Sequence, residues 1–111
     1  MDLPENVQEY LEHIVECVKA TMPVSAIYLF GSYATGNYHE DSDLDIFIVT
    51  PDNSKRKNEF SLAVRKSLGK PKQFPLDILV CHEEEFAIKS KHINRVENEV
   101  IETGVKLYAS S

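Results

Sequence analysis

Two apolar stretches separated by a polar segment dominate the sequence between residues 26 and 49, AIYLFGSYATGNYHEDSDLDIFIV. The first stretch ends at Gly31-Ser32, and the second begins around Asp43 and Asp45. Short apolar runs containing β-branched and aromatic residues are typical of buried β-strands, so this segment predicts two strands joined by a polar connection. We expect the chemistry of the protein in that connection, where polar and charged side chains gather.

Asp43 and Asp45 flank Leu44 at the start of the second strand. Side chains two apart in a strand project from the same face, so the two carboxylates are expected side by side, with Leu44 and Ile46 turned toward the core. Carboxylates held this close repel each other, and a divalent cation is a natural compensation. Oxygen-only donors suit Mg²⁺ or Mn²⁺ better than zinc. The pair therefore predicts a metal site.

Gly31 and Ser32 suit an anion, in contrast to the two aspartates, which suit a cation. Glycine lets the backbone turn sharply and approach a ligand closely, and exposed N–H groups at the entry to a short helix bind phosphate oxygens. Alone, the pair is equally compatible with a plain strand-to-helix turn. Beside two carboxylates it favours a site for a nucleoside triphosphate chelated to a metal ion, since that ligand needs both features.

The pattern of Gly31-Ser32, ten residues, and then Asp43-x-Asp45 resembles the G-S-x10-D-x-D signature of the nucleotidyltransferase superfamily that includes DNA polymerase beta. The short chain is similar to the minimal nucleotidyltransferase branch of that superfamily. The resemblance implies an α/β (α+β) fold, a small mixed sheet flanked by helices. It also implies a third carboxylate on a neighbouring strand. Asp77 in FPLDILV is the candidate, because an unpaired charge inside a strand needs an explanation.

The resemblance assigns a role to each of these residues. Asp43, Asp45 and Asp77 would be the catalytic and metal-binding residues, with Mg²⁺ or Mn²⁺ as cofactor, and Gly31 and Ser32 would bind the phosphates. The implied reaction transfers a nucleoside monophosphate, AMP from ATP as the first choice, to an acceptor hydroxyl with release of pyrophosphate. Asp77 could also help to deprotonate that hydroxyl. The alternative for Asp77 is an edge strand that turns it to solvent.

The resemblance also implies a partner. Minimal nucleotidyltransferases are often encoded with a helical HEPN protein, which can be a toxin and the acceptor, so an antitoxin role is expected; a homo-oligomer is the other arrangement. Family members often carry an arginine near the position of Thr35. Its absence supports a second hypothesis, a weakly catalytic or non-catalytic scaffold or inhibitory subunit. A third hypothesis, a small-molecule modifier such as an aminoglycoside nucleotidyltransferase, usually requires an added helical domain or a dimer.

Three other motif interpretations fail. The spacing of Gly31 and Gly36 suggests a P-loop, but Asn37-Tyr38 stands where lysine and Ser/Thr are required. DSDLD resembles the start of an EF-hand loop, yet Ile46 replaces the required glycine. A G-x-G-x-x-G dinucleotide fingerprint does not occur in the sequence.

Length and composition set the class of protein. The 111 residues suffice for a single domain, predicted to span 1–111, and the net charge of -6 argues against a free-standing nucleic-acid binder. The sequence has neither an apolar run of about 18 residues nor a signal peptide, so no membrane association is expected. Cys17 and Cys81 lack metal-binding spacing and are interpreted as core thiols of a reducing compartment, by default the cytoplasm.

Hydrophobic periodicity, together with capping, glycine and proline residues, predicts the remaining helices and strands. The first helix begins near Asp2, with Glu5 completing a capping box, and ends near Met22-Pro23. Later helices are expected at 55–68 after an N-cap at Ser54, at 82–91 and at 94–103, the last with Val96, Val100 and Ile101 inward. The expected strands span 25–30, 44–49, 74–81 and 105–108, and a turn spans 69–73.

Overall fold

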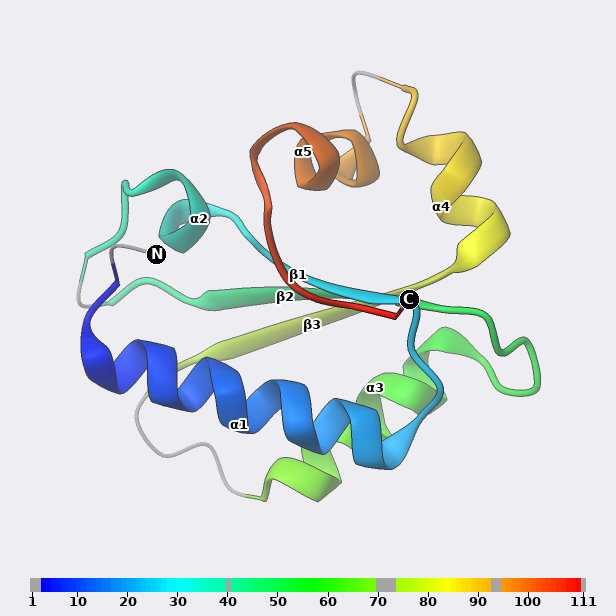
Figure 1. Ribbon diagram of the computed structural model, residues 1–111, viewed down its shortest axis with the longest axis horizontal. Coiled ribbons are helices and arrows are strands. Elements are labelled where there is room, and N and C mark those ends of the chain that lie inside the picture. The colour runs from blue at the N-terminus through cyan, green and yellow to red at the C-terminus, as the bar shows by residue number, and fades with distance from the viewer. Residues whose placement is uncertain (1–2, 40, 70–73, 93–94, 111) are drawn as a thin grey trace.

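The chain forms one mixed sheet of four strands with helices on both faces (Figure 1). The computed structural model describes residues 3–39, 41–69, 74–92 and 95–110. The strands are β1 (Ala26–Phe30), β2 (Leu44–Thr50), β3 (Leu76–His82) and β4 (Val105–Ala109), in the spatial order β3-β2-β1-β4. The predicted α/β class is therefore confirmed.

Pairing in the sheet follows from the connections between the strands. β1 runs antiparallel to both β2 and β4, whereas β2 and β3 are parallel. A parallel pair needs a crossover connection, and α3 (Lys57–Leu68) provides it. The crossover sets β2 and β3 in register from Leu44–Leu76 to Thr50–His82. As a result, the starts of these two strands meet at one end of the sheet.

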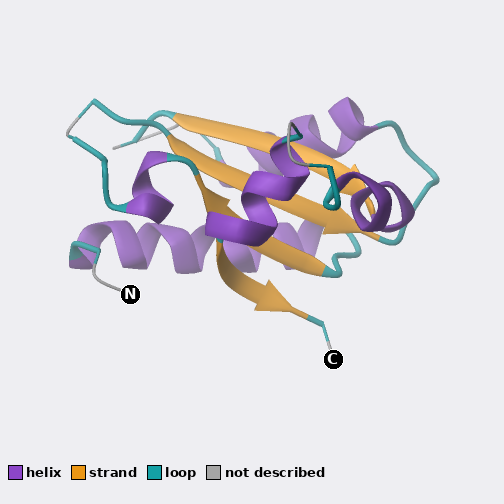
Figure 2. Cartoon of the chain, turned by 90° about the horizontal axis from the view of Figure 1, so that it is seen from above, coloured by secondary structure: helices purple, strands orange, loops and turns teal. Residues whose placement is uncertain are grey.

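The other helices divide between the two faces and one end of the sheet. Figure 1 shows α1 (Glu5–Thr21) and α3 below the sheet, and α4 (Glu83–Lys89) and α5 (Val96–Thr103) above it. The short helix α2 (Ser32–Thr35) follows directly on β1. Figure 2 shows, from above, the strands lying between these two helical layers. No helix among the described residues is long and apolar enough to span a bilayer.

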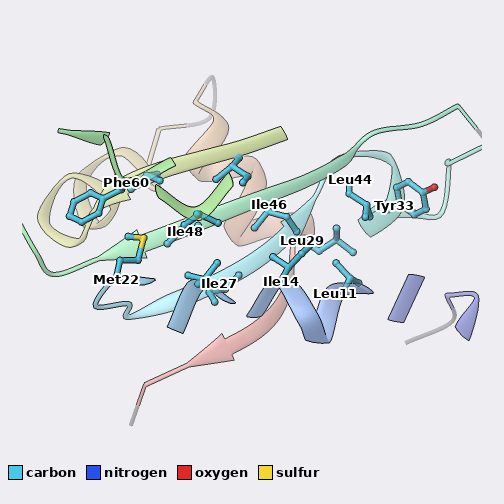
Figure 3. Close-up of a cluster of buried hydrophobic side chains, with 14 of the residues drawn as sticks. Leu11, Ile14, Met22, Ile27, Leu29, Tyr33, Leu44, Ile46, Ile48 and Phe60 are labelled. Atoms are coloured by element: carbon cyan, nitrogen blue, oxygen red, sulfur yellow. The ribbon is translucent and has the colours of Figure 1, made fainter. Parts of the chain in front are cut away.

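Alternation along the strands separates the core into two clusters. Ile27, Leu29, Ile46 and Ile48 pack with α1 and α3 in the larger cluster, which Figure 3 shows. The intervening side chains belong to the smaller cluster under α4 and α5, made of Tyr28, Phe30, Phe47, Val49, Cys81 and Val100. Because successive side chains alternate between faces, the face toward α4 and α5 is also the one that carries Asp45.

Most predicted elements are confirmed to within a few residues, and four local predictions are wrong. The N-cap of α3 is Arg56 and not Ser54, whose N–H instead donates to Asp52 Oδ1 at 2.8 Å. Cys17 is only half-buried, because it lies beside the exposed His13 on α1 and not in the core. The N-cap of α1 is Pro4, which makes no side-chain capping hydrogen bond, so Glu5 is the first residue of the helix and does not complete the predicted capping box. Asp2 itself and most of the predicted turn at 69–73 lie outside the described residues.

The fourth error concerns α5. Val100 is fully buried as predicted, but Val96 and Ile101 are 41% and 48% exposed. A helix of eight residues has only about two turns, and this one contacts the sheet through a single buried side chain. The prediction assumed a wider apolar face than so short a helix presents to the sheet.

Candidate active site

Asp45 occupies the sheet position that connects the predicted site residues. In β2 it pairs with Phe30, the last residue of β1, and with Asp77 of the parallel strand β3. Residues paired in register project from the same face of a sheet, with strands about 5 Å apart. The exposed Asp77 and the half-buried Asp45 therefore lie side by side. The structure thus brings together two carboxylates that are distant in the sequence.

Asp43 is held just before β2 by the hydrogen bonds of its neighbours. The Ser42 N–H donates to the His39 carbonyl oxygen at 3.0 Å, and the His39 N–H donates to Ser42 Oγ at 2.9 Å. On the other side, the Leu44 N–H donates to the Pro75 carbonyl oxygen at 2.9 Å. Asp43 itself is exposed. Its backbone is thereby fixed between two anchored residues, at the end of the sheet where β2 and β3 begin.

Gly31 connects β1 to α2 in a conformation that other residues avoid. Its φ of 75° and ψ of -155° lie in a region that is essentially restricted to glycine. A Cβ at this position would lie 2.2 Å from Oδ2 of Asp45 and 3.1 Å from its Cγ. The Asp45 carboxylate therefore packs directly against the Gly31 backbone. The sequence predicts that a ligand approaches the Gly31 backbone closely, and in the structure the approaching group is the carboxylate of Asp45, a predicted metal ligand.

Ser32 opens the short helix α2, so the helix entry expected after Gly31 is present. The N–H groups of Ala34 and Thr35 donate to the Gly31 carbonyl oxygen at 3.1 and 3.2 Å. The first amides of a helix have no intrahelical acceptor, which leaves those at positions 32 and 33 available to a ligand or water. The Thr35 hydroxyl lies 3.4 Å from the carbonyl oxygens of Gly31 and Ser32, and it therefore serves the helix itself.

The carboxylates influence one another strongly. The pKa of Asp45 is raised to about 6, first by burial and then by the negative charges of Asp77, Asp43 and Glu99. Each charge that shifts this pKa is negative. Bringing like charges together in a partly buried site disfavours ionisation, and a cation would reverse that effect. The site is therefore electrostatically prepared for a positive ligand.

Glu99 also belongs to this cluster, although no pattern in the sequence indicates it. It lies on α5, next to Val100, which packs with Phe30 and Phe47 on the face that carries Asp45. Glu99 itself is exposed. No local motif marks this residue. Only knowledge of which helix covers the end of β1 could have identified it.

Comparison with known proteins assigns the family. The family model described as nucleotidyltransferase domain matches residues 11–103. The chain belongs to this family. The nucleotidyltransferase is 31% identical over 106 residues to a Methanocaldococcus jannaschii protein named "Putative protein adenylyltransferase MJ0141", and the match covers 92% of this chain and 99% of that relative. The resemblance drawn from the Gly-Ser and Asp-x-Asp pattern is confirmed.

Solved structures share the fold of this nucleotidyltransferase. A chain from a toxin-antitoxin structure with AMP-PNP superposes with a TM-score of 0.61 at 22% identity, covering 91% of this chain and 74% of that one. A chain from the complex of tri-AMPylated Shewanella oneidensis HEPN toxin with MNT antitoxin gives 0.57 at 19% identity, covering 93% and 72%. At this level of identity the likeness concerns the fold alone.

The aspartates of the nucleotidyltransferase suit a hard divalent cation by their chemistry. Asp43, Asp45 and Asp77 offer only oxygen donors, and two of them raise the pKa of the third. Within the described part of the chain, no three His, Cys, Asp or Glu side chains are already arranged around a common metal position. The carboxylates are thus linked electrostatically without forming a closed ligand cage.

Proposed function

We propose that this nucleotidyltransferase transfers AMP from ATP to a hydroxyl group of a protein acceptor, with Mg²⁺ as cofactor. The observation that carries the proposal is the position of Asp45, in register with Asp77 and packed against Gly31. It joins the candidate metal ligands to the candidate phosphate-binding turn. The name of the adenylyltransferase relative and the AMP-PNP in a neighbour of the same fold support ATP as the donor.

Each residue has a defined task in the proposed reaction. The backbone N–H and hydroxyl of Ser32 would bind the distal phosphates, in the space beside the Gly31 turn. Asp43, Asp45 and Asp77 would hold Mg²⁺, which when bound supplies charge neutralisation and orientation of the triphosphate. The acceptor oxygen forms a bond to the α-phosphorus as the bond to pyrophosphate breaks. Asp77 is exposed and would accept the proton that this hydroxyl loses.

A helical HEPN-type protein is the proposed acceptor and partner. One neighbour of the same fold comes from a complex with a tri-AMPylated HEPN toxin. We expect the 111 residues to form a single domain, so the surface that recognises a larger acceptor would come from a partner protein. Modification of such a partner would make this chain the antitoxin of a two-protein system.

Radiolabel transfer tests the proposal. Purified protein, ATP labelled at the α-phosphate and Mg²⁺ are incubated with the protein encoded beside its gene, and label on the acceptor is measured. We expect transfer to fall at least about a hundredfold in Asp43→Ala and Asp45→Ala, because both remove a ligand for the metal. Asp41→Ala is the matched control, since it removes an exposed carboxylate from the same loop. Equal transfer by all three variants would refute the assignment.

The competing function is binding without turnover. The observation in its favour is Thr35, which stands where the family resemblance leads us to expect an arginine and whose hydroxyl lies close to helix carbonyl groups. A scaffold would bind its partner equally well with Asp43 and Asp45 replaced, and it would transfer no label. Partner affinity and label transfer, measured on the same variants, therefore separate the two functions.

A further inference from the structure

The two edges of the sheet differ in how they are protected. β3 and β4 are its outer strands, and Figure 2 shows β4 at the margin that leads to the C-terminus, with β3 at the other margin. The pairing of β4 with β1 is interrupted at Leu107, which has no partner in β1, and the exposed Lys106 lies beside this bulge. Bulges and lysines on edge strands oppose the addition of another strand. β4 is therefore a protected edge.

The strand β3 lacks these protections. Its seven residues, LDILVCH, include no lysine, arginine or proline. Along the described strand, pairing with β2 continues without a bulge from Leu44–Leu76 to Thr50–His82. Its only carboxylate is Asp77, which belongs to the candidate active site. A long, regular and mostly apolar edge strand is a template for pairing with another chain.

One hydrogen bond identifies the backbone groups that lie along this edge. The Leu44 N–H donates to the Pro75 carbonyl oxygen at 2.9 Å, so the carbonyl of Pro75 faces β2. In a strand, the backbone groups of every second residue point to the same side. The N–H and C=O groups of Leu76, Ile78 and Val80 therefore point outward, away from β2. No described residue forms a hydrogen bond with them, so they are open to an added chain.

The face of β3 beside the active site is also open. Asp77, Leu79 and Cys81 alternate onto the face that α4 and α5 cover. Cys81 is only 2% exposed and belongs to the cluster against which Phe86 of α4 packs. Leu79, in contrast, is 37% exposed, and Asp77 is exposed as well. The helices thus leave the first half of β3 uncovered, next to the proposed general base.

The acceptor of the proposed reaction suits this edge better than a second copy of the chain does. β3 contains no serine, threonine or tyrosine, so a second β3 would cover Asp77 without supplying a hydroxyl group. A residue of an added strand that pairs with Asp77 would project from the same face, about 5 Å away. A hydroxyl side chain at that position would meet the carboxylate proposed to accept its proton, whereas an acidic side chain would be repelled.

We propose that an extended segment of the acceptor protein adds to the open edge of β3 as a further strand, with its hydroxyl residue beside Asp77. The outward backbone groups of Leu76, Ile78 and Val80 would bind the main chain of this segment, and Leu79 would contact its apolar side chains. The identity of the occupant rests on the proposed function, whereas the open edge does not. Main-chain pairing would position the acceptor with little demand on its sequence.

Amide hydrogen exchange tests the proposal. Exchange is followed on the ¹⁵N-labelled chain, alone and with the protein encoded beside its gene. In the free chain we expect the outward amides at 76, 78 and 80 to exchange quickly and the inward amides at 77, 79 and 81 to be protected. The partner should slow exchange of the outward amides at least about tenfold, because they become hydrogen-bonded. Transfer of label from ATP is measured on the same samples.

Two leucine substitutions sharpen the test. Leu79→Lys introduces on β3 the kind of side chain that protects edge strands, and it should weaken partner binding about tenfold. Leu62→Lys is the matched control, because it makes the same change at a leucine of α3 that is 56% exposed, on the other face of the sheet. It should weaken binding less than about twofold. Thermal unfolding checks that both variants are folded.

The outcomes distinguish this inference from the proposed function. Label transfer with unchanged exchange at 76, 78 and 80, or with equal effects of the two variants, would overturn strand addition and leave the proposed function standing. Slowed exchange without transfer would support strand addition and refute the proposed function. Absence of a complex would refute both. Slow exchange at these amides in a free chain that sediments as a dimer would overturn the proposal in favour of a second copy.

Discussion

Two carboxylates on the same face of the sheet behave in opposite ways. Asp45, at the start of β2, has its pKa raised to about 6 by burial and by other acids. Glu85, on α4 near the far end of β3, has its pKa lowered to about 2 by hydrogen bonds from Lys57 and Lys89. The corresponding N–O distances are 2.5 and 2.7 Å, and the Cys81 thiol adds a third contact at 3.3 Å.

Ionised Glu85 stabilises the fold, whereas ionised Asp45 destabilises it. Glu85 satisfies its charge within the chain, between α3, β3 and α4. Asp45 is surrounded by acids, and its ionised form is therefore unfavourable in the chain alone. A group of like charges that lowers the stability of the fold is typical of a functional site. Each prediction below tests one side of this contrast.

The largest effect on stability is expected for Gly31→Ala. The new Cβ would overlap the Asp45 carboxylate, and the backbone conformation excludes other residues, so unfolding free energy should fall by about 2–3 kcal/mol. Gly36→Ala is the matched control, because Gly36 also has a positive φ but a Cβ added there would meet no described atom within 4 Å beyond its chain neighbours. It should lose only about 1 kcal/mol in urea denaturation. Equal losses would mean that the Gly31–Asp45 contact is unimportant.

Removing the negative charge of Glu85 should have the next largest effect on the free energy of unfolding. Glu85→Gln should destabilise the protein by about 1–2 kcal/mol at pH 7, because both lysine pairs are lost. The folded pKa of about 2 lies below the ordinary value of 4.5, so the stabilisation is present above pH 4.5 and declines as pH falls toward 2. Urea denaturation at pH 7 and pH 3 should therefore show a smaller difference at the lower pH. A constant difference would contradict the ion-pair explanation.

Removing the negative charge of Asp45 should raise the free energy of unfolding, the opposite of the effect expected for Glu85. Asp45→Asn should stabilise the metal-free protein by about 1 kcal/mol at pH 8. The folded pKa of about 6 lies above the ordinary value of 3.8, so the destabilisation by ionised Asp45 is complete above pH 6 and disappears toward pH 4. Denaturation with a chelator at pH 4 and pH 8 measures this change. Asp41→Asn, on the adjacent loop, should change stability by less than about 0.5 kcal/mol at either pH.

The smallest change in stability is expected for Asp77→Asn. Its side chain is exposed, so unfolding free energy should change by less than about 0.5 kcal/mol. Mg²⁺-dependent ATP binding, measured by calorimetry, should nevertheless weaken about tenfold, because Asp77 lies in register with Asp45. Unchanged nucleotide affinity and unchanged transfer would remove Asp77 from the site.

The sequence predicted those parts of the structure that local patterns determine. The strands around Gly31 and Asp45 were predictable because apolar runs and a turn residue define them, and the family signature lies in the same segment. The proximity of Asp77 was predictable only on the assumption that its strand pairs with β2, which the register shows. The roles of these residues as ligands stay predictions.

The remainder depended on contacts between distant segments. Glu99 reaches the carboxylate cluster because α5 packs over the end of β1, and no pattern within α5 records that packing. The exposure of Val96 and Ile101 has the same origin, since the sheet offers α5 room for one buried side chain. Helix periodicity indicates which residues share a face, but it does not indicate how much of that face is buried against the rest of the protein.

The parallel pairing of β2 with β3 has a consequence for how the protein matures. Asp45 and Asp77 become neighbours only after the crossover through α3 has brought β3 alongside β2. The Leu44 N–H then donates a hydrogen bond to the Pro75 carbonyl oxygen. A nascent chain that has emerged only as far as α3 would possess the Gly-Ser turn and two aspartates, yet lack the third. Nucleotide binding would then report completion of the native topology, and ligand present during synthesis would favour finished molecules over partly assembled ones.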